Sequence, residues 1–158
     1  MAETWLHASV DIFGEMLPKA LVGEEFARFL SGVHKAIVEL AGAGFPVILD
    51  HVMARREWLD ELLSLFEGTP VLFVAVRAPL EVLEQREKDR GDRNAGLARE
   101  QFDVVHRHSV YDLELDTSVL SPTQCAQVIR DRVTVGPGAG FERMRAAATG
   151  PLPSPRRS

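Results

Sequence analysis

Asp11 and Asp50 each stand directly after a short segment, residues 5–10 and 45–49, whose pattern is typical of a β-strand. A carboxylate at such a place can take a proton from a substrate hydroxyl, and Asp50 also resembles the acidic residue that positions Mg²⁺ or its water in nucleotide-hydrolysing folds. The plainer alternatives are that Asp11 caps a helical turn and that Asp50 belongs to a turn. The spacing by itself leaves both interpretations open.

Arg86, Arg90 and Arg93 lie at spacings that place them on one helical face, provided that the helix continues past Gly91. Guanidinium groups gathered in this way suit phosphate oxygens and the charge that spreads over a transferring phosphoryl group. The alternative is a solvated face of mixed charge, because acidic residues are interleaved with the arginines. These acidic residues are Glu87, Asp89 and Asp92.

The histidines and the cysteine offer little further chemistry at this level. His106 and His108 are two residues apart on an expected helix and point to different faces, so we predict no metal site there. We interpret His7 and His51 as isolated residues, and Cys125 as a packed, inert thiol inside the last helix.

The elements that would position these side chains alternate between strands and helices. We expect strands at 5–10, 45–49, 71–76 and 111–117, and helices at 24–43, 56–66, 80–90, 95–108 and 121–133, the last opened by a capping box at Ser121. The alternation predicts an α/β fold with a small parallel sheet, whose ligands gather at the carboxyl ends of its strands. We expect one domain over residues 1–133 and a disordered tail over 134–158.

Composition narrows the class of protein. The chain has 158 residues, of which 46% are hydrophobic, enough for the core of one domain. A single cysteine excludes a disulfide scaffold and fits the cytoplasm. We expect neither a membrane span nor a signal peptide, since no apolar run approaches about 20 residues. The net charge of −5 argues against a nucleic-acid partner.

Several segments resemble the chloramphenicol phosphotransferase-like family of P-loop kinases, over roughly residues 5–133. The resembling segments are Trp5-Leu-x-x-x-Val-Asp11, Met16-Leu-Pro18, Val47-Ile-Leu-Asp50-x-Val52, Arg90-Gly-Asp-Arg-Asn-Ala-Gly96-x-Ala98-x-x-Gln101, Val104-Val-His106 and Tyr111-Asp-x-Glu-x-Asp-Thr117. The long stretch from Arg90 to Thr117 is the most specific part of the resemblance.

The resemblance implies a reaction and a set of roles. Members of the family transfer the γ-phosphate of ATP, with Mg²⁺, to a hydroxyl of chloramphenicol, and Asp11 matches their catalytic base. Arg90 and Arg93 match the arginines of a lid that closes over the phosphates. The further residues expected near substrate or nucleotide are Asp50, Arg86 and Gln101.

One part of the family pattern has no counterpart in the printed sequence, which contains no Gly-x-x-x-x-Gly-Lys-[Ser/Thr] motif. In the family a strand–P-loop–helix unit precedes the segment that begins here at Trp5, and its strand lies between those expected at 46–50 and 71–76. We therefore expect a P-loop-kinase-like fold without this central unit, and a true start upstream rather than a decayed remnant. An inactive, pseudokinase-like module and an acceptor other than chloramphenicol stay open as alternatives, and the oligomeric state is left open.

Overall fold

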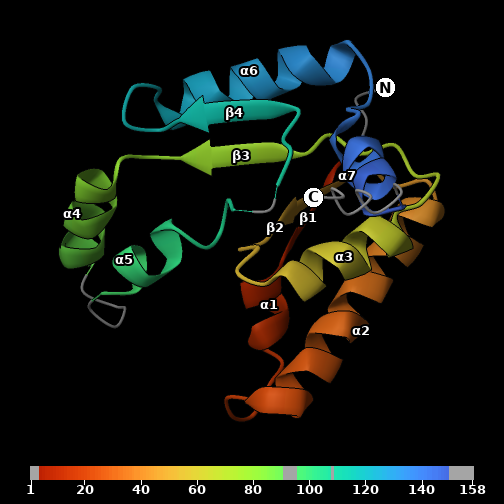
Figure 1. Ribbon diagram of the computed structural model, residues 1–158, viewed down its shortest axis with the longest axis horizontal. Coiled ribbons are helices and arrows are strands. Elements are labelled where there is room, and N and C mark those ends of the chain that lie inside the picture. The colour runs from red at the N-terminus through yellow and green to blue at the C-terminus, as the bar shows by residue number, and fades with distance from the viewer. Residues whose placement is uncertain (1–3, 91–95, 108, 150–158) are drawn as a thin grey trace, which may run out of the picture. The chain divides into compact units, whose positions relative to one another are not determined.

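The chain folds into two units, Met1–Thr69 (unit 1) and Pro70–Ser158 (unit 2), each built on a two-stranded parallel sheet (Figure 1). The computed structural model describes residues 4–90, 96–107 and 109–149. The α/β class with short parallel strands and flanking helices is confirmed. The boundary at Thr69 falls inside the domain expected over 1–133, and each hydrogen-bonded pair of strands lies wholly on one side of it. The expectation of one domain over 1–133 stays a prediction.

Unit 1 consists of strands β1 and β2 and three helices. Its elements are β1 (Leu6–Ser9), α1 (Val10–Gly14), α2 (Gly23–Gly42), β2 (Val47–Asp50) and α3 (Arg56–Leu65). The two strands pair in parallel, from Leu6 opposite Val47 to Ser9 opposite Asp50. Both strands therefore end at the same edge, and α1 leaves β1 at that edge without an intervening loop.

The core of unit 1 follows from the apolar spacing of its two long helices. Residues three and four apart share one helical face, and this spacing on α2 and α3 buries one stripe of each helix, as predicted. The buried apolar residues of the two stripes are Leu30, Val33, Ile37, Leu59, Leu62 and Leu63. One polar side chain, His34, is buried among them with 0% of its surface exposed.

Unit 2 holds the second strand pair and four helices. Its elements are β3 (Val74–Arg77), α4 (Leu80–Arg90), α5 (Leu97–Phe102), β4 (Leu113–Asp116), α6 (Pro122–Thr134) and α7 (Gly140–Thr149). The strands pair in parallel, from Val74 opposite Leu113 to Arg77 opposite Asp116. The predicted capping box is confirmed, because Ser121 and Gln124 satisfy each other's backbone N–H groups at the start of α6.

The four strands described form two sheets, and β2 and β3, between which the resemblance places the strand expected to be missing, each pair with a single strand among the described residues. Two other expectations differ from the structure. The segment 71–76 is not covered on both sides, since Val76 is 58% exposed. The helix expected at 95–108 is shorter, because α5 ends at Phe102 and turns follow.

The disorder expected from residue 134 onward is wrong for the segment that forms α7. Asp112, whose side chain is 3% exposed, accepts hydrogen bonds from the backbone N–H groups of Ala139 and Gly140 at 2.8 and 2.7 Å, and so anchors the start of this helix. Phe141 and Met144 of α7 are buried. Residues 150–158 lie outside the described residues, and none of the helices described is long and apolar enough to cross a membrane.

Candidate functional site

Asp11 and Asp50 lie at the same edge of the β1–β2 sheet, as predicted. Asp50 is the last residue of β2 and pairs with Ser9, while Asp11 follows Ser9 by two positions in the first turn of α1. The cap of α1 is Ser9, whose hydroxyl accepts a hydrogen bond from the Asp11 N–H at 3.2 Å. The alternative role of Asp11 as the helix cap is therefore wrong, and its carboxylate takes no part in capping α1.

Both carboxylates at this edge are open to solvent. Among the residues that the structure describes, neither carboxylate takes part in a hydrogen bond or an ion pair. Two such carboxylates can accept a proton or help to hold a hydrated divalent cation. The described residues contain no cluster of three or more histidine, cysteine or acidic side chains that could bind a metal ion. A cation held by Asp11 and Asp50 would therefore need further oxygen ligands from a substrate or from water.

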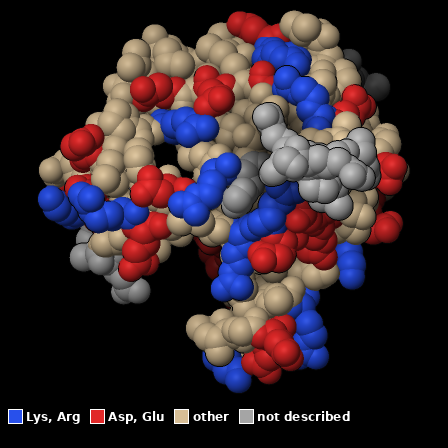
Figure 2. Space-filling view, in the orientation of Figure 1, with Lys and Arg blue, Asp and Glu red and all other residues tan. Residues whose placement is uncertain are grey.

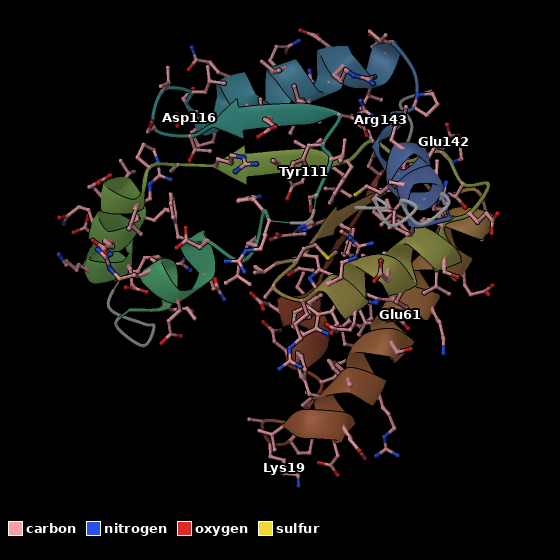
Figure 3. The ribbon with its side chains drawn as sticks, in the orientation of Figure 1. Lys19, Glu61, Tyr111, Asp116, Glu142 and Arg143 are labelled. Carbon is pink, nitrogen blue, oxygen red and sulfur yellow. The ribbon has the colours of Figure 1, made fainter. Side chains whose placement is uncertain are left out.

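His51 is not the isolated residue that the sequence suggested. Its Nε2 lies 2.9 Å from Nε2 of His34 on α2, and Nδ1 of His34 lies 2.7 Å from Oε2 of Glu61 on α3 (Glu61 is labelled in Figure 3). The Ser31 hydroxyl donates a short hydrogen bond to the other oxygen of Glu61. These contacts connect α2 and α3 to the residue that follows β2.

The charges in this array follow from its hydrogen bonds. Burial raises the pKa of Glu61, but hydrogen bonds from Ser31 and His34 and the nearby charges of His34 and Lys35 outweigh it, so the pKa is lowered overall. Glu61 is therefore ionised at neutral pH and accepts the proton on Nδ1 of His34.

The imidazole of His51 behaves differently. Burial, reinforced by the neighbouring His34, lowers its pKa from 6.5 to about 4, against smaller opposing contributions from the Val52 backbone and from Asp11. His51 is therefore neutral at pH 7. The raising contribution of Asp11 also shows that this carboxylate lies within electrostatic range of the His51 ring.

The Trp58 ring packs beside the His51 imidazole, with ring centroids 5.9 Å apart. Trp58 in turn contacts the ring of Phe26, at 6.0 Å, and the guanidinium of Arg55, at 5.6 Å from its centroid. The Trp58 face contributes to the burial that lowers the pKa of His51.

In unit 2, Arg86 lies at the carboxyl end of β4, where it binds the chain itself. Its guanidinium donates to the hydroxyl and to the carbonyl oxygen of Thr117, at 2.8 and 2.7 Å, and the Thr117 hydroxyl donates to the carbonyl of Arg77 at 3.0 Å. Arg86 thus holds together the ends of β3 and β4. Its expected place near substrate or nucleotide stays a prediction.

The other predicted residues of unit 2 belong to the α4–α5 segment. Arg90 is the exposed last residue of α4, Gln101 is a half-buried residue of α5, and Arg93 lies outside the described residues. Asp11 and Asp50 belong to unit 1, whereas these residues belong to unit 2.

Acidic side chains of α4 form hydrogen bonds and an ion pair with the start of α5. The Glu87 carboxylate accepts hydrogen bonds from the backbone N–H groups of Gly96 and Ala98, each at 2.9 Å, and Glu84 pairs with Arg99 at 2.7 Å. Figure 2 shows acidic and basic side chains interspersed on the face in view. The interleaved charges therefore have a structural use, because Glu87 supplies the acceptors that the first turn of α5 needs.

The sequence interpretation missed His34, Glu61 and the connection to His51. The available signal was His34 itself, which interrupts the apolar stripe of α2 between Val33 and Ile37. A fully buried histidine must find partners for its ring nitrogens, and α3 packs against that stripe.

Comparisons with known proteins agree with one another. The family model described as chloramphenicol phosphotransferase-like protein matches residues 1–134. Two Mycobacterium tuberculosis proteins, from strains CDC 1551 and H37Rv and provisionally named O-phosphotransferases, are 30% identical over 173 residues, which cover 91% of this chain and 77% of theirs. The tunicamycin resistance protein of Deinococcus radiodurans is 18% identical, with a TM-score of 0.58 over 82% of both chains, so it has a similar fold.

Proposed function

This chain belongs to the chloramphenicol phosphotransferase-like family, and from this premise we propose that it is a small-molecule O-phosphotransferase. The reaction moves the γ-phosphate of ATP to a hydroxyl of a small alcohol such as chloramphenicol, in the cytoplasm. The observation that carries the proposal is the exposed carboxylate of Asp11, which stands at the carboxyl edge of the β1–β2 sheet while Ser9 does the capping of α1.

Asp11 acts as the general base. As the acceptor oxygen forms its bond to the γ-phosphorus and the bond to the departing ADP oxygen breaks, the hydroxyl proton passes to the Asp11 carboxylate. Phosphoryl transfer needs little covalent chemistry from the protein, so catalysis depends on where the hydroxyl is held and on how the developing charge is stabilised.

The residues present suit Mg²⁺ and ATP in their chemistry. The exposed carboxylate of Asp50 is the oxygen ligand that Mg²⁺ accepts in combination with waters and phosphate oxygens. We assign the phosphates to the guanidinium groups of Arg90 and Arg93, with Arg86 and Gln101 nearby. When bound, Mg²⁺ neutralises part of the negative charge on the phosphates.

The test compares the full chain with two variants, Asp11→Asn and Asp60→Asn. Each protein is incubated with MgATP and a panel of hydroxyl-bearing acceptors that includes chloramphenicol, and the phosphorylated product is measured by mass spectrometry. Loss of a general base costs about 10²–10⁴-fold in rate, so Asp11→Asn loses activity at least about 100-fold while MgATP binding is unchanged. Asp60, an exposed α3 residue paired with Arg56, is the matched control and keeps wild-type activity.

Each outcome decides a different part of the proposal. Wild-type activity in Asp11→Asn would show that Asp11 is not the base. If only another acceptor is phosphorylated, the proposed reaction stands and chloramphenicol is not the substrate. If the wild-type chain neither gains thermal stability from MgATP nor modifies any acceptor, the chain is a pseudokinase-like module and not an enzyme.

A further inference from the structure

Three side chains from three different segments of unit 1 meet next to the carboxyl end of β2. Glu61 belongs to α3, His34 to α2, and His51 to the loop that follows β2. Both ring nitrogens of His34 have a partner, Glu61 Oε2 at 2.7 Å and His51 Nε2 at 2.9 Å. We call these three residues the Glu61–His34–His51 array.

A polar network of this kind is retained in a core only when its members satisfy one another, because an unpaired buried polar group is costly. His34 is fully buried, whereas the Glu61 side chain is 29% exposed. A leucine at position 34 would extend the apolar stripe of α2 without this cost. The array therefore points to a role beyond filling the core.

Its position relative to the strand edge suggests that role. His51 directly follows Asp50, the last residue of β2. The contact between the Nε2 atoms of His51 and His34 ties this position to α2, and the contact of His34 with Glu61 ties it to α3.

We propose that the Glu61–His34–His51 array is a positioning device that fixes the loop after β2, and with it the carboxylate of Asp50 at the strand edge that it shares with Asp11. The inference rests on the proposed phosphotransferase function for its effect on the reaction. His51 acts through Asp50 and is a positioning residue.

A pair of substitutions separates the hydrogen bond from the bulk of the side chain. In His51→Gln the terminal amide can reach the place of Nε2 and keep the bond to His34. In His51→Asn the shorter amide cannot reach it, and His34 is left with one partner. Asp60→Asn again serves as the surface control on α3.

The first measurement does not depend on enzymatic activity. Hydrogen exchange of the full chain, followed by mass spectrometry, reports the backbone of residues 50–55. We expect His51→Asn to exchange about tenfold faster there, the effect of one lost hydrogen bond, and His51→Gln to match the wild type. Equal exchange in the two variants would overturn the positioning role.

Kinetics then connect the array to the reaction. We expect His51→Asn to lower kcat/KM for the acceptor about tenfold and to leave the KM for ATP unchanged, with His51→Gln close to wild type. If the wild type transfers phosphate and the two variants do not differ, the array has no part in the reaction although the function stands. If the wild type transfers none, the proposed function fails, and the exchange results still decide the structural claim.

Discussion

Replacing Asp112 by alanine removes one buried carboxylate that accepts hydrogen bonds from three backbone N–H groups. Oδ2 binds the N–H of Phe73 at 2.9 Å, just before β3, and Oδ1 binds those of Ala139 and Gly140 at the start of α7. The side chain thus connects the segment before β3 to the last helix of unit 2.

The cost can be worked out bond by bond. Ala139 is exposed, so water can replace its partner, whereas Phe73 and Gly140 are less accessible. Leaving a buried donor without a partner costs about 1–3 kcal/mol, and removing the negative charge from the start of α7 adds about 0.3–1 kcal/mol. With two such donors left unpaired, we expect Asp112→Ala to lower the free energy of unfolding by about 2–7 kcal/mol. Such a loss is a large part of the stability of an ordinary domain.

Asp112→Asn is the milder test, because its oxygen can still face α7 while its amide opposes the Phe73 N–H. We expect it to cost about 2 kcal/mol. Asp131→Ala is the control, since that aspartate makes an exposed bond to Gln127 within α6. Urea unfolding followed by far-UV circular dichroism gives the free energies, and hydrogen exchange over residues 139–149 reports α7. If Asp112→Ala and Asp131→Ala both stay within about 0.5 kcal/mol of wild type, the carboxylate does not anchor α7.

Three further predictions concern protonation, packing and capping. The native state holds His51 with a pKa lowered from 6.5 to about 4, so it binds fewer protons than the unfolded chain. The contribution of His51 to the free energy of unfolding is fully present above pH 6.5 and falls by about 3 kcal/mol as the pH drops to 4. Urea unfolding midpoints measured between pH 7 and pH 4 should therefore depend less on pH in His51→Gln than in the wild type. The same pH dependence in both proteins would contradict this prediction. A methyl group on Gly138 would overlap the Asp112 carboxylate, so Gly138→Ala should speed exchange in α7 much as Asp112→Asn does. Ser121→Ala removes the capping box of α6 and should cost about 1 kcal/mol in urea unfolding; a loss below 0.3 kcal/mol would show the cap to be unimportant.

Local patterns determined most of the helices. The apolar spacing of residues 24–43 and 56–66 predicted α2 and α3 to within about a residue at each end, since a helical stripe is a property of neighbouring positions. The capping box at Ser121 likewise needs only residues three apart. The edge shared by Asp11 and Asp50 was predictable too, because parallel strands end on the same side.

What the sequence could not decide depended on residues far apart along the chain. The order of α7 rests on Asp112, 27 and 28 positions before the N–H groups that it binds, and no local pattern of the Gly- and Pro-containing segment at 136–140 indicates this. The role of Arg86 was set by Thr117, 31 positions away.

His51 is the clearest case of a residue whose role only tertiary structure could decide. Taken alone, it is a single histidine after a strand, and nothing in its neighbours predicts a neutral ring. Its partner His34 lies 17 positions before it, and Glu61, the other partner of His34, lies 27 positions after His34. Their meeting requires α2 and α3 to pack against each other beneath the strand edge, because hydrogen bonds and burial act over a few ångströms of space whatever the separation in sequence.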